Sequence, residues 1–382
     1  MTKPQHLKTK AHPRTLIIGI EAPYNRLENI QAYYEEFLNL LKTSDIEYDE
    51  SLFLKLREIN PRSFISPGRL DSIRELCKKN NIAEVIISEP LTAPQAKNLE
   101  NYLDCKIFDR TDLILDIFRK SAKTAEGKKQ VEIATFEHEK TRLAGKGIFL
   151  EQQRSGSGIK GKAGAKSGFG ETLKEREKRI YNAKIQQLKK ELEHLQKARD
   201  TQRKQRLTTQ VPQICLIGYT NAGKSTILNQ LTHADVLAED KLFATLDTTT
   251  RELYINGKKK GVLSDTVGFI QFLPHQLIEA FKSTLSELKD ASLLIEVIDA
   301  SDPACYAHIE VVQDILNELE VSKPILYVFN KIDKLPEEAH EAFALKAQKY
   351  QPHVIVSAKT KERLKPLIDY LATWNVEQKK SS

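Results

Sequence analysis

A glycine-rich loop that follows an apolar run limits the possible folds of this chain more than any other feature. The run Gln213–Ile217 leads into Gly218–Ser225, whose letters GYTNAGKS match the pattern G-x-x-x-x-G-K-[ST], and Thr226–Leu231 continues with helical spacing. Glycines let such a loop wrap closely round phosphate oxygens, and its N–H groups and the helix N-terminus supply positive potential. The pattern predicts an α/β domain whose phosphate loop, Gly218–Ser225, binds a nucleotide.

Every residue of the phosphate loop is a candidate nucleotide contact, and two of them have distinct tasks. Lys224 is expected to reach the β- and γ-phosphates, and the Ser225 hydroxyl is expected to ligate Mg²⁺. The candidate contacts in the loop are Gly218, Tyr219, Thr220, Asn221, Ala222, Gly223, Lys224 and Ser225. The loop alone does not say which base the nucleotide carries.

A second motif indicates the base. The apolar run Ile325–Phe329 ends in the candidate contacts Asn330, Lys331, Ile332 and Asp333. The Asp333 carboxylate can accept guanine N1–H and the exocyclic amino group, a pair of donors that adenine lacks. Asn330 can tie this segment to the phosphate loop, and the Lys331 stem can pack along the base plane. The motif therefore selects guanine.

A third segment completes the expected base site. The apolar run His353–Val356 leads to Ser357, Ala358 and Lys359, whose backbone can contact the base oxygen. We therefore expect GTP and GDP, with Mg²⁺, as the ligands of the site.

Two segments between these motifs are expected to sense the γ-phosphate. The strand-like run Gly261–Ser264 ends at Asp265, Thr266, Val267 and Gly268, where Asp265 can hold Mg²⁺ through water and the Gly268 N–H can bond the γ-phosphate. Both segments are expected to order with a triphosphate and to relax after hydrolysis, which would make the domain a switch.

The other sensing segment comprises Phe243, Ala244, Thr245, Leu246 and Asp247, and it supplies Thr245 as the second hydroxyl ligand of Mg²⁺. The three threonines at 248–250 compete for this role, and Thr245 is preferred among them. The expected catalytic residues are thus Lys224, Thr245 and Gly268, and the expected metal ligands are Ser225 and Thr245.

The residue after Gly268 is unusual for a GTP-hydrolysing enzyme. Many small GTPases have a glutamine there that orients the attacking water, whereas this chain has Phe269 followed by Ile270. Because an apolar side chain cannot position water, we expect slow intrinsic hydrolysis of GTP to GDP and phosphate. Docking on a partner would then accelerate it.

The positive charge of the chain is concentrated in one region. The 382 residues carry a formal +7, but residues 119–210 hold 24 Lys and Arg against 11 Asp and Glu, a local +13, so the rest carries −6. The same region contains a seam of apolar residues with spacings of 4, 3, 4 and 3, formed by Tyr181, Ile185, Leu188, Leu192 and Leu195. Such a stripe needs a partner helix, for which the stretch from Thr111 to about Leu143 is the candidate. The region is expected to be an antiparallel two-helix arm.

A glycine-rich, basic segment joins the two expected helices. The segment 152–170 contains Arg154, Lys160, Lys162 and Lys166 and no acidic residue, and 8 of the 16 glycines lie between 145 and 170. One interpretation is a solvated flexible linker. A loop that contacts nucleic acid is favoured, since basic charge, glycine and a long arm coincide.

The remaining sequence bounds the organisation. Apolar runs at Thr15–Ile20 and Ala83–Ser88, with helical spacing at Pro94–Leu103 and after Ser66-Pro67-Gly68, predict a small α/β domain with a mainly parallel sheet. The expected division is an N-terminal α/β domain at 1–118, the basic arm at 119–210, the nucleotide-binding domain at 211–376 and a tail at 377–382. No run approaches the roughly 18 apolar residues of a membrane span. The four cysteines have neither metal nor disulfide spacing, which is typical of a reduced cytoplasmic protein.

Taken together, the motifs resemble the HflX family of GTPases. The signature segments are Gly218–Thr226, Phe243–Asp247 and Asp265–Ile270 with its continuation to His275, and outside them Asn60-Pro61, Asp109–Thr111 and Gly170–Thr172 also look like that family. The resemblance covers most of residues 14–375. It implies a P-loop GTPase domain, an N-terminal α/β domain and an intervening helical arm.

The same resemblance implies a function. It suggests a protein that binds the large ribosomal subunit and its rRNA and splits or recycles stalled ribosomes using GTP. We expect this protein to be monomeric and cytoplasmic, and peripheral membrane association is left open. The alternative is an assembly or hibernation factor that uses GTP only as a binding switch on the large subunit. A third hypothesis is a GTPase that acts on another RNA.

Overall fold

The computed structural model describes residues 12–24, 30–155, 168–208, 211–232, 242–243, 249–274, 277–278, 285–360 and 362–375. Its contacts divide the chain into two units. The first comprises residues 1–113 and 141–175, and the second comprises residues 114–140 and 176–382.

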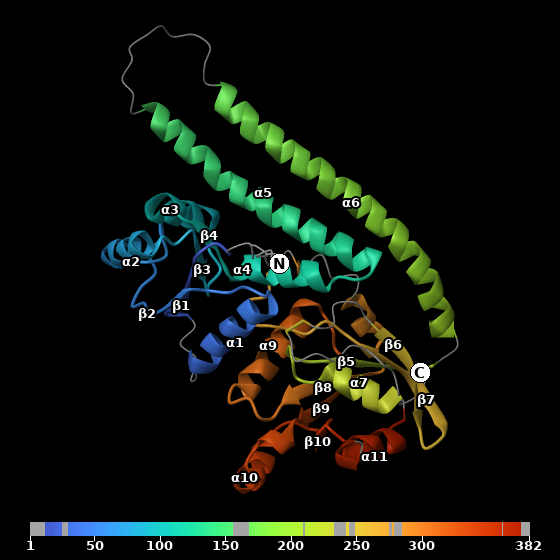
Figure 1. Ribbon diagram of the computed structural model, residues 1–382. Coiled ribbons are helices and arrows are strands. Elements are labelled where there is room, and N and C mark those ends of the chain that lie inside the picture. Colours follow the sequence, from blue (N-terminus) through green and yellow to red (C-terminus); the bar gives the residue numbers. More distant parts are fainter. Residues whose placement is uncertain are drawn as a thin grey trace, which may run out of the picture. The chain divides into compact units, whose positions relative to one another are not determined.

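The first unit is built on a parallel sheet with the strand order β2-β1-β3-β4 (Figure 1). Each strand is joined to the next by a helix, as in a series of βαβ crossovers. The elements are β1 (Thr15–Glu21), α1 (Ile30–Thr43), β2 (Glu50–Lys55), α2 (Pro67–Asn80), β3 (Glu84–Ile87), α3 (Ala93–Leu103) and β4 (Lys106–Phe108). The predicted α/β architecture with a parallel sheet is confirmed here.

Local sequence explains where the helices of this unit begin and end. α2 starts with a proline, and α3 starts after Thr92, whose hydroxyl accepts the Gln95 N–H while the Gln95 side chain accepts the Thr92 N–H in return. This reciprocal pair satisfies two donors that a helix N-terminus otherwise leaves free. Asn81 and Asp104, both in the left-handed conformation, end α2 and α3.

The helical stretch predicted from Thr111 to Leu143 is two helices, so the prediction of one continuous helix is wrong. α4 (Arg110–Ser121) ends before a short break, and α5 (Ala125–Ser155) begins after it. Thr124 causes the new start: its hydroxyl accepts the Gly127 N–H at 3.0 Å, and its carbonyl accepts the Lys128 N–H at 3.0 Å. Threonine is a favoured N-cap residue because its side chain satisfies such a donor.

Within the second unit, α5 pairs with α6 (Gly168–Thr208) through the predicted apolar seam (Figure 1). Ile185, Leu188 and Leu192 of α6 form a buried cluster with Ile133 of α5, with Phe136 packed against it. Ion pairs flank the cluster, one between Lys129 and Glu191 and one between Lys189 and Glu137 at 3.0 Å. Residue numbers that rise on one helix fall on the other, so the pair is antiparallel, as expected.

The seam ends earlier than predicted. Leu195 is 37% exposed, whereas a continued seam requires it to be buried. The ion pair of Lys129 with Glu191 lies close to the start of α5, so Leu195, one turn further along α6, meets the partner helix near its end.

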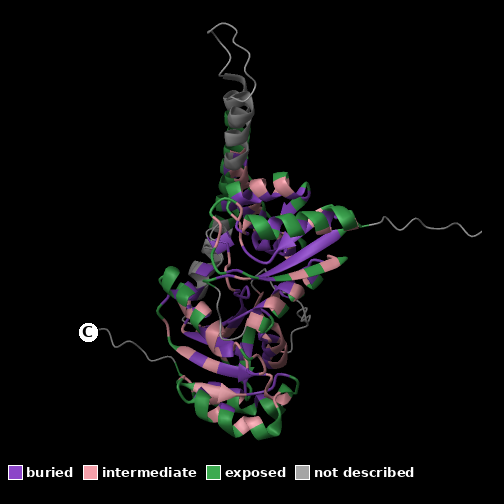
Figure 2. Ribbon diagram, turned by 90° about the vertical axis from the view of Figure 1, so that its left-hand side faces the viewer, coloured by how far each residue is buried: buried purple, intermediate pink, exposed green. Residues whose placement is uncertain are grey.

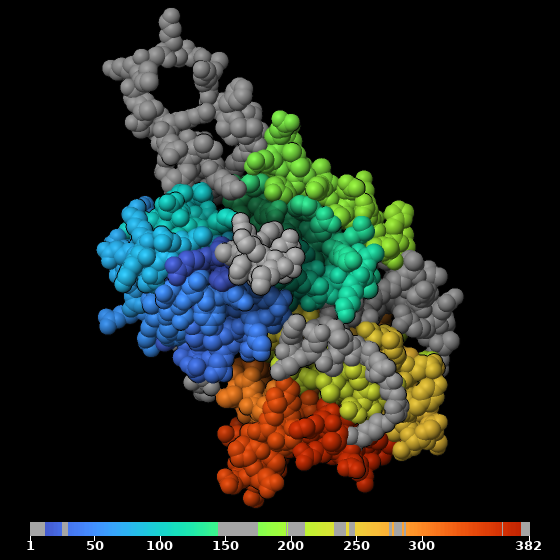
Figure 3. All heavy atoms as spheres, in the orientation of Figure 1, coloured from blue at the N-terminus to red at the C-terminus, as the bar shows by residue number. Residues whose placement is uncertain are grey.

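The outer flank of α6 carries exposed basic residues. Between residues 175 and 190 they include Arg176, Lys178 and Arg179, on the part of α6 that lies at the surface in light green in Figure 3.

The predicted glycine-rich loop is shorter than its sequence suggests. α5 continues to Ser155 and α6 begins at Gly168, so both ends of the expected loop 152–170 are helical. Arg154 belongs to α5. Lys160, Lys162 and Lys166 lie outside the described residues.

The second unit also contains a sheet with the order β10-β9-β8-β5-β7-β6 (Figure 1). All neighbouring strands are parallel except β6 and β7, which form an antiparallel pair. The strands are β5 (Gln213–Ile217), β6 (Thr249–Ile255), β7 (Lys258–Asp265), β8 (Leu293–Asp299), β9 (Ile325–Asn330) and β10 (His353–Ile355). The helices are α7 (Lys224–Thr232), α9 (Cys305–Glu318), α10 (Glu337–Ala347) and α11 (Lys365–Thr373), with short 3₁₀ turns η1 (Ser286–Asp290), η2 (Ile332–Lys334) and η3 (Glu362–Leu364).

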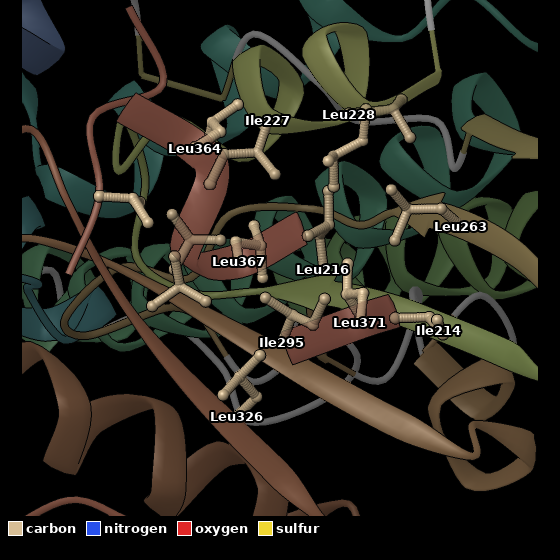
Figure 4. Close-up of a cluster of buried hydrophobic side chains, with 14 of the residues drawn as sticks. Ile214, Leu216, Ile227, Leu228, Leu263, Ile295, Leu326, Leu364, Leu367 and Leu371 are labelled. Atoms are coloured by element: carbon tan, nitrogen blue, oxygen red, sulfur yellow. The ribbon is translucent and has the colours of Figure 1, made fainter. Parts of the chain in front are cut away.

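A buried aliphatic cluster holds α7 and α11 against this sheet. Leucine and isoleucine side chains from β5, β7, β8 and β9 interlock with those of the two helices (Figure 4), and the central strands are almost wholly buried (Figure 2). Continuous burial explains why β5 is apolar from Ile214 to Ile217, and β8 apolar apart from Glu296 up to Ile298, instead of alternating between apolar and polar residues. Burying one such side chain contributes about 1.5–3 kcal/mol, so the cluster gives the carboxyl ends of the strands a rigid base.

Glu296 is an exception within the buried strand β8. Its Oε2 accepts the Gln313 amide at 3.0 Å, and its Oε1 has no hydrogen-bond partner among the described residues. Desolvation raises the pKa of the Glu296 carboxyl to about 8, so the folded protein keeps this acid protonated at neutral pH.

This raised pKa predicts a stability effect. Since the folded-state pKa lies above the unfolded value, the free energy of unfolding falls as pH rises from about 4.5 to about 8, by up to about 1.4 kcal/mol per pH unit. Glu296→Gln, an isosteric neutral side chain, should remove this contribution and stabilise the protein at pH 8. Denaturant unfolding between pH 5 and 8.5 measures it, with exposed Glu341→Gln as the control. Parallel pH profiles for the Glu296→Gln and wild-type proteins would contradict the assignment.

Among the helices in the described part of the chain, none combines the length and the apolar character that crossing a bilayer requires.

Candidate nucleotide-binding site

The predicted motifs meet at the carboxyl edge of the sheet in the second unit. The chain leaves β5 toward β7 on one side of it and then returns to β8 on its other side, so the strand order reverses at β5. In open α/β sheets a ligand binds at the carboxyl ends of the strands at such a reversal. The phosphate loop follows β5, Asp265 ends β7, and Asn330 ends β9. Three segments that are far apart in sequence therefore face one site.

Two glycines of the phosphate loop are required by its backbone. Gly218 has φ +136° and Gly223 has φ +99°, conformations that side chains rarely permit. A Cβ at Gly218 would overlap the Val297 carbonyl oxygen, and one at Gly223 would overlap the Asn330 amide nitrogen. The loop can therefore approach β8 and the end of β9 only because these two residues lack side chains.

Lys224 lies wrapped inside the loop. Its Nζ donates to the carbonyl oxygens of Tyr219 at 2.8 Å and Gly218 at 3.1 Å. Burial lowers the pKa of the Lys224 ammonium to about 8, although the Asp265 carboxylate acts in the opposite direction. A phosphate anion beside this ammonium would favour the charged form, because an opposite charge raises the pKa of a lysine.

The lowered pKa predicts that nucleotide binding depends on pH. Above about pH 8, binding must restore a proton to Lys224, so nucleotide affinity should fall by up to tenfold per pH unit, and below pH 8 this group should have no effect. Calorimetry in buffers of different ionisation enthalpy measures the proton taken up between pH 7 and 9. Lys224→Met should abolish the uptake, while Lys323→Met, outside the loop, should leave it intact. Uptake that is equal at pH 7 and 9 would contradict the assignment.

A hydroxyl and a carboxylate meet next to the loop. The Ser225 hydroxyl donates to Asp265 Oδ2 at 2.6 Å, and Asp265 is fully buried at the end of β7. The neighbouring Thr266 hydroxyl donates to the Leu216 carbonyl at 2.6 Å, which fastens this segment to β5. Hydroxyl and carboxylate oxygens are the ligands that Mg²⁺ prefers, so the donor set fits that ion.

The base motif is tied to the phosphate loop by side chains of two residues. The Asn330 amide donates to the Ala222 carbonyl at 2.8 Å, and its oxygen accepts the Ala358 N–H at 2.9 Å. Lys331, in the left-handed conformation, donates to the Asn221 carbonyl at 2.6 Å. The structure thus brings the segments at 218–225, 330–333 and 357–359 together.

Asp333 is held by Ser357 of the last motif. The Ser357 hydroxyl donates to Asp333 Oδ1 at 2.5 Å, and this bond is the main cause of the lowered pKa of the Asp333 carboxyl. The carboxylate is therefore ionised and oriented at neutral pH. Each of its oxygens has two lone pairs, so it can accept further hydrogen bonds from a base.

Asp299 is a residue that the sequence reasoning missed. It ends β8, and its carboxylate pairs with the Lys331 ammonium at 2.7 Å while also accepting the N–H and hydroxyl of Ser301. The available signal was an acidic residue directly after the buried run 293–298, at the same sheet edge as Asp265.

Gly268 lies against the phosphate loop with little room for a side chain. A Cβ there would be 3.0 Å from Thr220 Cα and 3.1 Å from Lys224 Nζ. The following residue, Phe269, is 1% exposed, and Ile270 is also buried. The Phe269 ring therefore belongs to the interior, and it offers no polar atom to a water molecule.

Of the expected γ-phosphate-sensing segment 243–247, the structure describes Phe243. The other four residues and the one after them, Ala244, Thr245, Leu246, Asp247 and Thr248, lie outside the described residues. Phe243 is buried, has φ +55°, and its ring lies 4.5 Å from that of Phe118 in α4. Of the threonines considered beside Thr245, Thr249 and Thr250 belong to β6, and the Thr250 hydroxyl bonds to the Ser264 hydroxyl at 2.9 Å.

Three family models match successive parts of the chain. Residues 31–119 match the model described as GTP-binding GTPase N-terminal, residues 121–206 match GTP-binding GTPase Middle Region, and residues 213–331 match 50S ribosome-binding GTPase.

Curated relatives agree with these models over most of the chain. A protein of Magnetococcus marinus called GTPase HflX is 38% identical over 95% of this chain and 82% of its own length. The chain belongs to the HflX family of GTPases. The HflX proteins of Caldanaerobacter subterraneus and Escherichia coli are 44% and 40% identical, each over 79% of this chain and 70% of their own length. Like its family, this GTPase binds guanine nucleotides and hydrolyses GTP.

Solved structures similar to this chain include the crystal structure of the SsGBP and GDP complex, with 25% identity, coverage of 94% and 97% of the two chains, and a TM-score of 0.49. A GTP-binding protein from Sulfolobus solfataricus in complex with GDP has 27% identity, coverage of 94% and 99%, and a TM-score of 0.44.

Proposed function

We propose that this HflX-family GTPase binds the large ribosomal subunit through its rRNA and splits or recycles stalled ribosomes, with hydrolysis stimulated by the ribosome. The burial of Phe269 is the observation that carries the proposal. Phe269 occupies the position at which many small GTPases have the glutamine that orients the attacking water. Because its ring is buried and apolar, the site needs a group from a partner or a rearrangement before it hydrolyses GTP quickly. The match of residues 213–331 to the 50S ribosome-binding GTPase model supports the ribosome as the partner that stimulates hydrolysis.

The proposed chemistry distributes tasks among the residues of the site. The Lys224 ammonium neutralises charge on the β- and γ-phosphates, and the Gly268 N–H donates to the γ-phosphate as charge develops on it. Mg²⁺ would be held by Ser225 and Thr245, with Asp265 orienting its water, and would supply electrostatic stabilisation of the phosphates. The segments 218–225, 243–247, 265–268, 330–333 and 357–359 contact the nucleotide.

The base is recognised by the end of β9. Asp333, oriented by Ser357, accepts the N1–H and amino group of guanine, and the Lys331 stem covers one face of the base. Asn330 fixes this segment to the phosphate loop, so the base and phosphate sites keep a constant separation.

The basic arm is proposed as the docking element. Residues 119–210 carry a net +13, and the exposed flank of α6 presents Arg176, Lys178, Arg179 and Lys190. Each lysine or arginine that neutralises an RNA phosphate releases condensed counterions, which gives affinity and a strong salt dependence. The proposed organisation keeps the domains at 1–118, 119–210 and 211–376, with a tail at 377–382, in a monomeric cytoplasmic protein.

The glycine-rich loop is the part of the arm proposed to reach RNA. Deletion of Gly156–Gly168 should abolish ribosome stimulation while basal GTP hydrolysis stays within twofold of wild type. A matched variant in which Lys160, Lys162 and Lys166 become glutamine keeps the length of the loop and removes its positive charge. It therefore shows whether the stimulation depends on the charge of the loop or on its length. Undiminished stimulation in the deletion protein would refute the role of the loop.

A second candidate function is an assembly or hibernation factor that uses GTP only as a binding switch on the large subunit. The ion-paired and hydrogen-bonded nucleotide site is equally suited to it. Sucrose-gradient sedimentation of intact ribosomes with this protein and GTP separates the two. A splitting factor depletes intact ribosomes and releases subunits, whereas a binding switch cosediments and leaves them intact. Tight binding to another RNA without preference for ribosomes would contradict both.

A further inference from the structure

Tyr219 links the phosphate loop to the segment that follows Gly268. The Gln271 N–H donates to the Tyr219 phenol oxygen at 2.9 Å. This hydrogen bond joins a side chain of the phosphate loop to the backbone of the expected γ-phosphate-sensing segment. The other expected roles of the loop involve phosphate, whereas this phenol is turned to the protein.

Backbone hydrogen bonds reinforce the same connection. The Thr220 N–H donates to the Phe269 carbonyl at 2.8 Å, and the Phe269 N–H donates to the Gly218 carbonyl at 3.1 Å. Together with the phenol, three hydrogen bonds hold the segment 269–271 against the loop. Of these, only the bond to the phenol can be removed by a side-chain substitution that leaves the backbone intact.

The phenol is itself held in place by α9. The Tyr219 ring stacks on the His308 imidazole, with 3.7 Å between ring centroids and 8° between planes, and Tyr219 is buried. His308 lies 3.8 Å from Asp302, whose carboxylate accepts the Ala304 N–H at the start of the helix. The position of the phenol oxygen is therefore set by a regular helix and a stacked ring pair.

The hydrogen bonds that hold the segment 269–271 against the phosphate loop also fix the position of the preceding residue, Gly268. The N–H and the carbonyl of its neighbour Phe269 both bond to the loop. A Cβ added at Gly268 would lie 3.0 Å from Thr220 Cα and 3.1 Å from the Lys224 Nζ, so the Gly268 backbone faces these two residues. A γ-phosphate held by Lys224 would thus find the Gly268 backbone already beside it. A diphosphate has no group at this position.

We infer that Tyr219 is a positioning residue that prearranges Gly268 for the γ-phosphate and so makes the site prefer GTP over GDP. The inference rests on the proposed function of Lys224 and Gly268. Loss of one neutral hydrogen bond typically lowers, about three- to tenfold, the equilibrium constant for forming a state that depends on that bond. Here that constant is the affinity for GTP. The effect should fall on GTP alone, because only GTP uses the prearranged position.

The test compares full-length wild-type and Tyr219→Phe proteins, which differ by one hydroxyl and share the ring that stacks on His308. We expect the Kd of a non-hydrolysable GTP analogue to rise about three- to tenfold and the Kd of GDP to stay within twofold. Steady-state KM for GTP should rise by the same factor with kcat within twofold, since KM equals Kd when chemistry is slow. Tyr254→Phe, which removes an exposed phenol bonded to Glu252, is the matched control and should change neither.

Two results would overturn the inference. An equal loss of affinity for GTP analogue and GDP would show that Tyr219 only supports the loop, and unchanged affinities would show that the bond is irrelevant. His308→Ala, which keeps the phenol and removes its stacking partner, should reproduce the selective loss in a milder form. Failure of the wild-type protein to respond to ribosomes would contradict the proposed function, whereas the comparison of variants with wild type tests Tyr219 alone.

Discussion

Asp333→Asn should change the protein from a guanine-nucleotide binder into a xanthine-nucleotide binder. The Asp333 carboxylate accepts from guanine N1–H and from the amino group, whereas an asparagine amide presents a donor to that amino group. Xanthine has a carbonyl oxygen there, which pairs with the amide donor while N1–H still donates to the amide oxygen. Two charge-assisted hydrogen bonds of about 1.5–3 kcal/mol each are at stake, so GTP affinity should fall by at least a hundredfold.

Competition of GTP and XTP for a fluorescent nucleotide measures this inversion. The amide oxygen that the Asp333→Asn substitution introduces should still accept the Ser357 hydroxyl, so the variant should unfold at the same temperature as wild type. Asp369→Asn, on the exposed face of α11, is the control and should keep the preference for GTP. If GTP affinity survived in the Asp333→Asn protein, the assignment of Asp333 to the base would be wrong.

Gly268→Ala should nearly abolish GTP hydrolysis while it leaves GDP binding almost unchanged. The added methyl would be 3.0 Å from Thr220 Cα and 3.1 Å from Lys224 Nζ, closer than about nine in ten side chains approach such atoms. We expect Gly268 and the loop to move apart by a few tenths of an ångström, which weakens the hydrogen bond from the Gly268 N–H to the γ-phosphate. Removal of one donor that stabilises charge in a transition state costs a hundred- to thousandfold in kcat.

Single-turnover hydrolysis with saturating GTP measures this loss, and titration with GDP shows whether the rest of the site is intact. Gly68→Ala is a matched control, because Gly68 in α2 has nothing within 4 Å of the place its Cβ would occupy. A Gly268→Ala protein that hydrolysed GTP at the wild-type rate would show that the Gly268 backbone has no part in the reaction.

The parts of the fold that depend on local pattern were predictable from sequence. The apolar run at Gln213–Ile217 is the buried strand β5, and the spacing of Ile185, Leu188 and Leu192 identifies a helix face that meets a partner. The break at Thr124 was also readable in principle, because threonine is a favoured N-cap residue, and its hydroxyl does accept the Gly127 N–H. It was missed since the surrounding residues, 111–121 and 125–143, have helical character on both sides.

Contacts between distant segments could be predicted only where both segments belong to motifs that are known to bind the same ligand. Asn330 was expected to reach the phosphate loop, and its amide bonds to Ala222. Nothing in the sequence relates Tyr219 to Gln271 or to His308, because these pairs depend on how β5, β7 and α9 pack. Leu195 fits the spacing of the seam, yet only the register of α5 against α6 shows that its partner ends there.

We propose that an RNA surface both docks this GTPase and triggers its hydrolysis, since buried Phe269 cannot orient water. The decisive experiment is the rate of GTP hydrolysis by the full-length protein with and without purified large ribosomal subunits, at fixed salt and Mg²⁺. We predict a many-fold higher rate with large subunits, and a stimulation that declines steeply as salt increases. Equal rates with and without large subunits would contradict this mechanism.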